Sequence, residues 1–108
     1  YPMYYTIIDV WKNNKSMKDS ISGRYSQEQD KFSDIDALGV FVDNHDNPRF
    51  LNNNGDHVAF TSAIVFSMTS RGIPFVYYGS EQYYGGGADP HNREVLWNNF
   101  NTQSPLYQ

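Results

Sequence analysis

Four consecutive polar residues, Asp43-Asn44-His45-Asp46, end the apolar run Val40–Val42 and combine residue types that can do chemistry. A carboxylate beside an imidazole can hydrogen-bond a polyhydroxyl ligand, and it can stabilise a positive charge that develops during a reaction. Asn and Asp also favour turns, so the cluster could instead cap a strand. One His with two Asp is weak evidence for a metal site. The residues alone leave these three interpretations open.

A second polar cluster lies in the glycine-rich segment 80–94, which contributes the acidic, basic and histidine residues Glu81, Asp89, His91, Arg93 and Glu94. The run Gly85–Gly87 lets the backbone come close to a ligand, but the segment lacks the glycine spacing and the Lys-Ser/Thr pair of phosphate-binding loops. Asp89 and Arg93 are four residues apart, so they could pair with each other or share the hydroxyls of one ligand. We interpret His91 and Glu94 as surface residues.

Three strands are predicted near these clusters. β-Branched and aromatic residues after a proline predict a strand over residues 3–8. The continuous apolar run over 37–42 predicts a strand that is buried on both faces, and the run over 73–79 predicts a third buried strand. The Asp43–Asp46 cluster directly follows the second of these strands, and the glycine-rich segment follows the third.

Helices are predicted between the strands. Mixed polar and apolar residues predict a short helix within 21–36, and a break follows at 52–56. Helical spacing then predicts a helix over 57–70, N-capped by Asp56 and ended near Gly72. Its predicted apolar stripe is Val58, Phe60 or Thr61, Ile64 or Val65, and Met68.

This alternation of strands and helices predicts an α/β fold with parallel strands and right-handed crossovers. Two architectures fit, a doubly wound open sheet and part of a (β/α)8 barrel. Both place ligand sites at the C-terminal ends of the strands, where both polar clusters are expected.

Composition limits the function classes. The chain has 108 residues, a formal net charge of -4 and no cysteine. An acidic chain with scattered basic residues argues against binding to nucleic acid, and the lack of cysteine excludes disulfides and thiolate metal sites. No apolar run approaches the ~20 residues of a membrane helix. The chain begins at Tyr1 without Met, and Ser104 and Pro105 look like the start of a helix, so we expect a fragment of a longer protein.

Four motifs, in order, resemble the α-amylase family (glycoside hydrolase family 13). GVFVDNHDNPRF closely resembles its seventh-strand motif, GIPFVYYGSEQ its eighth-strand motif, and GGGADPHNRE the loop that follows. YPMYYTIIDVWK is similar to the sixth-strand region of the fungal-type enzymes. The resemblance implies that residues 1–108 are part of a catalytic (β/α)8 TIM barrel, from about strand six to the start of helix eight.

The resemblance also implies a function, the endo-hydrolysis of α-1,4-glucosidic bonds in starch or glycogen by a retaining mechanism. Asp46 matches the family's transition-state-stabilising carboxylate, and His45 matches a histidine that binds the sugar. Asp89 and Arg93 match residues that hold further glucose units. The nucleophile and the general acid of the family precede Tyr1, so the chain alone is expected to be inactive. Asp43 receives no catalytic role, and Arg49 is interpreted as a structural anchor.

Further expectations follow from the resemblance. The whole protein is expected to be a secreted, extracellular monomer that acts on starch and maltooligosaccharides, with no nucleic-acid or membrane partner. Calcium is expected in the whole protein, with ligands outside this segment. No chloride site is expected, because YYGSEQ offers no basic residue. The alternatives are an α-glucosidase or transglycosylase of the same family, and a non-catalytic glucan-binding relative.

Overall fold

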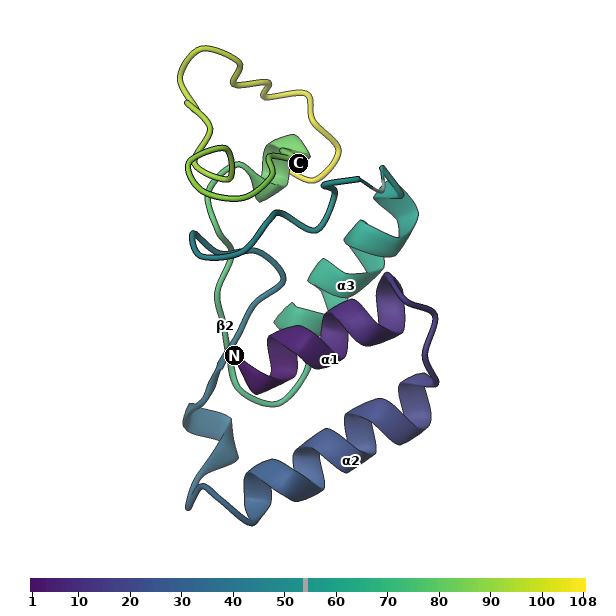
Figure 1. Ribbon diagram of the computed structural model, residues 1–108. Coiled ribbons are helices and arrows are strands. Elements are labelled where there is room, and N and C mark those ends of the chain that lie inside the picture. Colours follow the sequence, from purple (N-terminus) through teal and green to yellow (C-terminus); the bar gives the residue numbers. More distant parts are fainter. Residues whose placement is uncertain (54) are drawn as a thin grey trace.

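The computed structural model describes residues 1–53 and 55–108, with three α-helices, two short strands and two 3-10 helices among them. In chain order these are α1 (Pro2–Trp11), α2 (Met17–Gln29), η1 (Ile35–Ala37), β1 (Gly39–Val40), α3 (His57–Thr69), β2 (Ile73–Pro74) and η2 (Ser80–Gln82). In Figure 1 the three helices lie on one side, and the strands with their loops lie on the other. The segment after η2 closes the end of the molecule far from α2.

The N-terminal segment is a helix, so the strand predicted over residues 3–8 is wrong. Pro2 lies at the start of α1, where its missing N–H leaves no helical hydrogen bond unmade. Met3, Tyr4, Ile7 and Val10 are all buried. Their spacing gives one helical face, so packing of this face overrides the strand preference of β-branched and aromatic residues.

The helix predicted within residues 21–36 is confirmed as α2, with earlier limits. It begins after Ser16, whose side chain accepts a hydrogen bond from the backbone N–H of Asp19 at 3.3 Å. It ends at Gln29 rather than continuing into the 30s. Helices α1 and α2 pack side by side (Figure 1), and Arg24 Nε donates to Thr6 Oγ1 at 3.0 Å between them.

Helix α3 confirms the helix predicted over 57–70 and its cap, because Asp56 Oδ1 accepts from the N–H of Ala59 at 2.9 Å. The predicted stripe is only partly right. Phe60 and Ile64 are buried, whereas Val58 is 81% exposed and Val65 and Met68 are also exposed. The break predicted at 52–56 includes residue 54, which lies outside the described residues.

Strands β1 and β2 pair in parallel, as predicted, with Gly39 opposite Ile73 and Val40 opposite Pro74. Both are shorter than the predicted ranges 37–42 and 73–79. The expected burial on both faces is wrong for β1, because Val40 is buried while Gly39 is exposed. The predicted burial of the third strand is also wrong, because both residues of β2, Ile73 and Pro74, are exposed.

The core lies between the helices and the strand pair. Its buried members are Met3, Ile7, Val40, Val42, Phe50, Leu51, Phe60, Ala63 and Ile64. Lys12 Nζ ties α1 to the loop after β1 by donating to the carbonyls of Phe50 at 2.9 Å and Asn52 at 2.8 Å. The expected helix start at Ser104 is a turn, and the Ser104 hydroxyl donates to the Glu81 carbonyl instead of capping a helix. None of the described helices is long and apolar enough to cross a membrane.

Candidate active site

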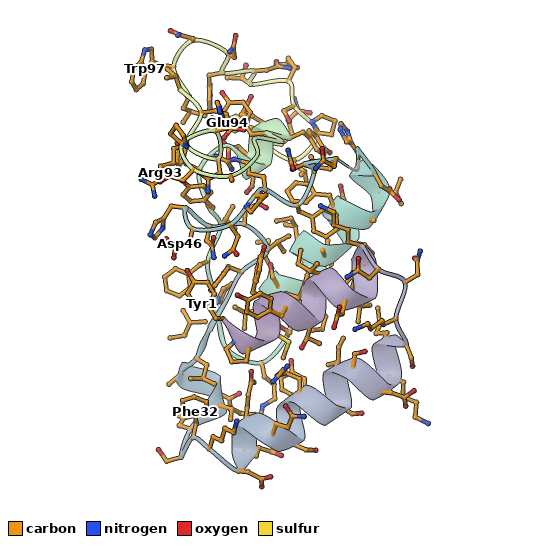
Figure 2. All side chains as sticks on the ribbon, viewed as in Figure 1. Tyr1, Phe32, Asp46, Arg93, Glu94 and Trp97 are labelled. Atoms are coloured by element: carbon orange, nitrogen blue, oxygen red, sulfur yellow. The ribbon has the colours of Figure 1, made fainter. Side chains whose placement is uncertain are left out.

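The two polar clusters meet at one edge of the molecule. The cluster 43–46 follows β1 and the segment 80–94 follows β2, and the C-terminal ends of parallel neighbours lie at the same edge. Figure 2 shows Tyr1, Asp46 and Arg93 in succession along the side opposite the helices. The structure therefore brings together the residues that the sequence analysis selected.

Asp46 and His45 present their side chains to solvent as a pair. His45 Nε2 lies 3.2 Å from Asp46 Oδ1, and the side chains are 63% and 51% exposed. The hydroxyl of Tyr1 donates to Asp46 Oδ2. This hydrogen bond is the main reason why the pKa of Tyr1 is raised, because the carboxylate stabilises the neutral phenol. A carboxylate, an imidazole and a phenol thus line one accessible surface suited to sugar hydroxyls.

Asp89 and Arg93 lie beside this surface and pair with each other. Arg93 Nε is 3.3 Å from Asp89 Oδ1, and both side chains are exposed. Arg93 Nη2 also donates to the carbonyl of His45 at 3.2 Å. The segment after β2 therefore contacts the cluster after β1 directly, and both predicted pairs can reach one extended ligand.

The backbone around Asp46 is held by two asparagines. Asn44 Oδ1 accepts from the N–H groups of Asp46 at 3.0 Å and Asn47 at 2.9 Å. Asn92 Nδ2 donates to the carbonyls of His45 and Asn47, each at 2.9 Å. The sequence analysis did not select Asn92, because a polar residue in a loop carries no periodicity that predicts where its side chain points.

Arg49 anchors both clusters from below, which confirms its interpretation as a structural residue. Its side chain is 0% exposed, and its Nε lies 2.6 Å from Glu94 Oε2. Glu94 Oε1 accepts from the N–H of Gly86 at 2.6 Å. The guanidinium also lies 4.5 Å from the ring centre of Tyr77, a cation–π contact. Glu94 is therefore an ion-pair partner with a partly buried side chain, and its interpretation as a surface residue is wrong, whereas His91 is exposed as expected.

Asp43 is buried beneath the site and links β1 to η2. Its Oδ1 accepts from the N–H of Phe50 at 2.7 Å, and its Oδ2 accepts from the hydroxyl of Ser80 at 3.0 Å. Burial raises the pKa of this carboxyl, while these hydrogen bonds and Arg49 oppose the rise. These contacts give Asp43 a structural role at the base of the site.

A cavity of about 290 Å³ opens on the exposed face of the strand pair. Its walls include the rings of Phe41, Phe75 and Tyr77, with Asn44 and His45 also lining it. Aromatic faces beside hydrogen-bonding groups suit the amphipathic surface of a sugar ring. In the part of the chain that the structure describes, no group of three or more His, Asp or Glu side chains is placed to hold a metal ion.

Comparison with known proteins identifies the family. The family model for the alpha-amylase catalytic domain matches residues 6–106, nearly the whole chain. The chain belongs to the alpha-amylase family. A Beta/alpha-amylase from Paenibacillus polymyxa is 46% identical over 116 residues, which cover all of this chain and 9% of that protein.

Solved structures agree with this assignment. An alpha-amylase from Malbranchea cinnamomea matches 98% of this chain and 23% of its own, with 40% identity and a TM-score of 0.89. CldA, described as a cyclomaltodextrin glucanotransferase with three domains, matches 97% of this chain and 22% of its own, with 34% identity and a TM-score of 0.87. The chain spans less than a quarter of the length of each of these three proteins. This chain of the alpha-amylase family therefore has the fold of one part of a (β/α)8 barrel.

Proposed function

We propose that this chain comes from an alpha-amylase that hydrolyses α-1,4-glucosidic bonds within starch-like glucans with retention of configuration. Within that barrel it would supply two neighbouring parallel strands, β1 and β2, with the helices around them, and no strand before α1. The family membership supports this proposal, and so does the position of both polar clusters at the C-terminal edge of the parallel strands. Active sites of (β/α)8 enzymes lie at that edge.

One observation carries the proposal: Asp46 is an accessible carboxylate beside an accessible imidazole, on a loop held by hydrogen bonds to the side chains of Asn44 and Asn92. A carboxylate in this position accepts hydrogen bonds from sugar hydroxyls. If these bonds strengthen as the ring distorts toward an oxocarbenium-like transition state, they lower the barrier rather than only improving substrate binding. His45 would bind the same sugar unit.

The Asp89–Arg93 pair would bind a glucose unit further along the glucan. Both groups are exposed, and each has hydrogen-bonding capacity beyond their mutual contact. Their contact with the loop of Asp46 through Arg93 would fix the spacing between the two subsites. The nucleophile and the general acid would come from residues outside this chain.

The test uses Asp46→Asn in the whole protein, with Asp30→Asn as a matched control at an exposed carboxyl away from both clusters. We expect Asp46→Asn to lower kcat on soluble starch by several orders of magnitude with a modest change in glucan affinity, and Asp30→Asn to leave kcat unchanged. An unmodified protein that binds glucan without cleaving it would instead favour a non-catalytic glucan-binding relative.

Transglycosylation is a second candidate, favoured by the similarity to the cyclomaltodextrin glucanotransferase CldA. Product analysis separates the two candidates. An endo-acting hydrolase yields linear maltooligosaccharides from soluble starch, whereas a glucanotransferase yields cyclic products or products longer than a short linear substrate. Preference for maltose over long chains would favour an α-glucosidase.

We also propose that the whole protein is a secreted monomer, independent of chloride, that binds calcium through residues outside this chain. Removing divalent cations with a chelator should lower its unfolding temperature, and adding calcium back should restore it. An unchanged unfolding temperature after chelation would count against a calcium site.

A further inference from the structure

One buried amide closes the turn that carries Asp46. The side-chain NH2 of Asn92 donates to the carbonyl of His45 and to the carbonyl of Asn47, each at 2.9 Å. These two residues stand immediately before and after Asp46. A single side chain from the segment after β2 therefore fixes the backbone on both sides of the carboxylate.

The same turn is held from its inner side by Asn44. Its Oδ1 accepts from the N–H of Asp46 at 3.0 Å and from the N–H of Asn47 at 2.9 Å. Asn44 belongs to the turn itself and moves with it, so it shapes the turn without fixing its place in the molecule. Asn92 lies 45 residues or more away along the chain and supplies that fixed point.

The hydrogen bonds of Asn92 come from a buried side chain. Asn92 is 0% exposed, so water does not compete for the two N–H donors of its side chain. Without these donors, the carbonyls of His45 and Asn47 would each lose a hydrogen bond. The Asp46 side chain, in contrast, is 51% exposed, and its own contacts are with two other exposed side chains, those of Tyr1 and His45. The buried contacts of Asn92 instead hold the backbone on both sides of Asp46.

We propose that Asn92 is a positioning residue for Asp46: it sets the place of the carboxylate relative to the sugar, and it couples the Asp89–Arg93 subsite to that carboxylate. The inference rests on the proposed function. Arg93, next to Asn92 in sequence, donates to the same His45 carbonyl at 3.2 Å. Both residues therefore hydrogen-bond the segment after β2 to the loop of Asp46.

The experiment compares Asn92→Ala with Asn52→Ala in the whole protein. Asn52 is a matched control, because its Nδ2 also joins two loops by donating to the Gly85 carbonyl at 3.1 Å, but it does not contact the turn of Asp46. We expect Asn92→Ala to lower kcat on a maltooligosaccharide by about 100-fold with little change in KM, the loss typical of a catalytic group displaced by roughly 1 Å. We expect Asn52→Ala to leave kcat close to the unmodified value.

A double variant separates positioning from general damage. Because Asp46→Asn removes the group that Asn92 positions, adding Asn92→Ala to it should lower the residual kcat by no more than about twofold. A full further loss of about 100-fold in the double variant, or equal losses from Asn92→Ala and Asn52→Ala, would overturn the proposal.

Asn92→Asp keeps the side-chain volume and serves as the second variant. Its buried carboxyl group faces two carbonyls, which raises its pKa, and only the protonated form donates a hydrogen bond. Its kcat relative to the unmodified protein should therefore rise as the pH falls, and a ratio independent of pH would count against positioning. If both Asn92 variants fail to fold while Asn52→Ala folds, Asn92 is a folding residue and the proposal is wrong.

These outcomes also separate the inference from the proposed function. If the unmodified protein cleaves no α-glucan, or if Asp46→Asn leaves kcat unchanged, the proposed function fails and the inference fails with it. If Asp46→Asn abolishes activity while Asn92→Ala behaves like Asn52→Ala, the inference alone fails.

Discussion

Replacing Arg49 by Met should destabilise the protein far more than the same replacement at Arg71. Arg49 is 0% exposed and lies 2.6 Å from Glu94, whose side chain is 27% exposed. Arg71 forms a similarly close pair with Asp36 at 2.7 Å, but these side chains are 48% and 57% exposed. Both pairs join an arginine to a carboxylate, but the Arg49 pair is buried and Arg49 also contacts Asp43 and Tyr77.

The expected magnitudes follow from this difference. Removing one partner of a buried ion pair leaves the other charge uncompensated and costs about 3–5 kcal/mol. Glu94 keeps some access to water, so we expect about 3 kcal/mol for Arg49→Met, the lower end of that range. Asp43, whose Oδ2 lies 3.8 Å from Arg49 Nη1, would lose its neighbouring cation as well. For Arg71→Met we expect a much smaller loss, because exposed ion pairs contribute little to stability.

The assay is thermal unfolding of the whole protein, followed by circular dichroism at several scan rates. One kcal/mol shifts Tm by about 2–4 °C in a domain of about 150–250 residues. Arg49→Met should therefore lower Tm by clearly more than Arg71→Met, although each kcal/mol shifts Tm less in a larger protein. Equal shifts would refute the reasoning that burial sets the cost, and a larger shift for Arg71→Met would reverse it.

Three further predictions concern other parts of the chain. A Cβ at Gly86 would overlap the His91 carbonyl oxygen, so Gly86→Ala should lower both Tm and kcat. At Gly23 in α2 a Cβ would meet nothing within 4 Å, so Gly23→Ala should raise stability by about 1 kcal/mol. Thermal unfolding checks both stability changes, and a starch-hydrolysis assay checks kcat. The Arg71 guanidinium lowers the pKa of Asp36, so the stability of this pair is present above the usual Asp pKa and is lost as the pH falls through the lowered value. Arg71→Met should remove that part of the acid dependence of the unfolding midpoint. The isolated 108-residue chain should release no reducing ends from soluble starch, and release would contradict a nucleophile and acid outside it.

The first helix shows where composition misled the sequence analysis. The segment over residues 3–8 is rich in β-branched and aromatic residues, which favour strands, yet Met3, Tyr4, Ile7 and Val10 repeat at helical spacing. This helical spacing was visible in the sequence, and it predicted the structure better than the residue types did. Burial of one helical face stabilises α1 more than the strand preference of its residues destabilises it. Pro2, interpreted as a residue before a strand, is the first residue of the helix.

The two strands were predicted at the correct place and with the correct direction, but too long. Only Gly39–Val40 and Ile73–Pro74 form the ladder. Strand length depends on hydrogen-bonding neighbours on both sides, and within the described residues β1 and β2 have only each other. An apolar run shows that a segment can be a strand, but it does not show which neighbour completes it.

The candidate site could also be predicted from the sequence only in part. The proximity of His45 and Asp46 to Asp89 and Arg93 could be predicted, because each pair follows a strand of one parallel sheet. The contacts of Asn92 and Glu94 could not, because the direction of a side chain in a loop depends on how the loop folds back. Both residues stand next to Arg93 in sequence, and both point inward, whereas Arg93 is exposed.

This alternation of inward and outward side chains explains how the segment after β2 can serve two purposes. Arg93 meets solvent beside Asp46, while its neighbours Asn92 and Glu94 bond to the loop of Asp46 and to Arg49. The two contacts differ in kind. The Asn92 contact consists of neutral hydrogen bonds to the backbone flanking Asp46, so its loss should act mainly on kcat. The Arg49–Glu94 contact is a largely buried ion pair, so its loss should act mainly on stability. A segment with both contacts can hold the site in place even though the strands beneath it are short.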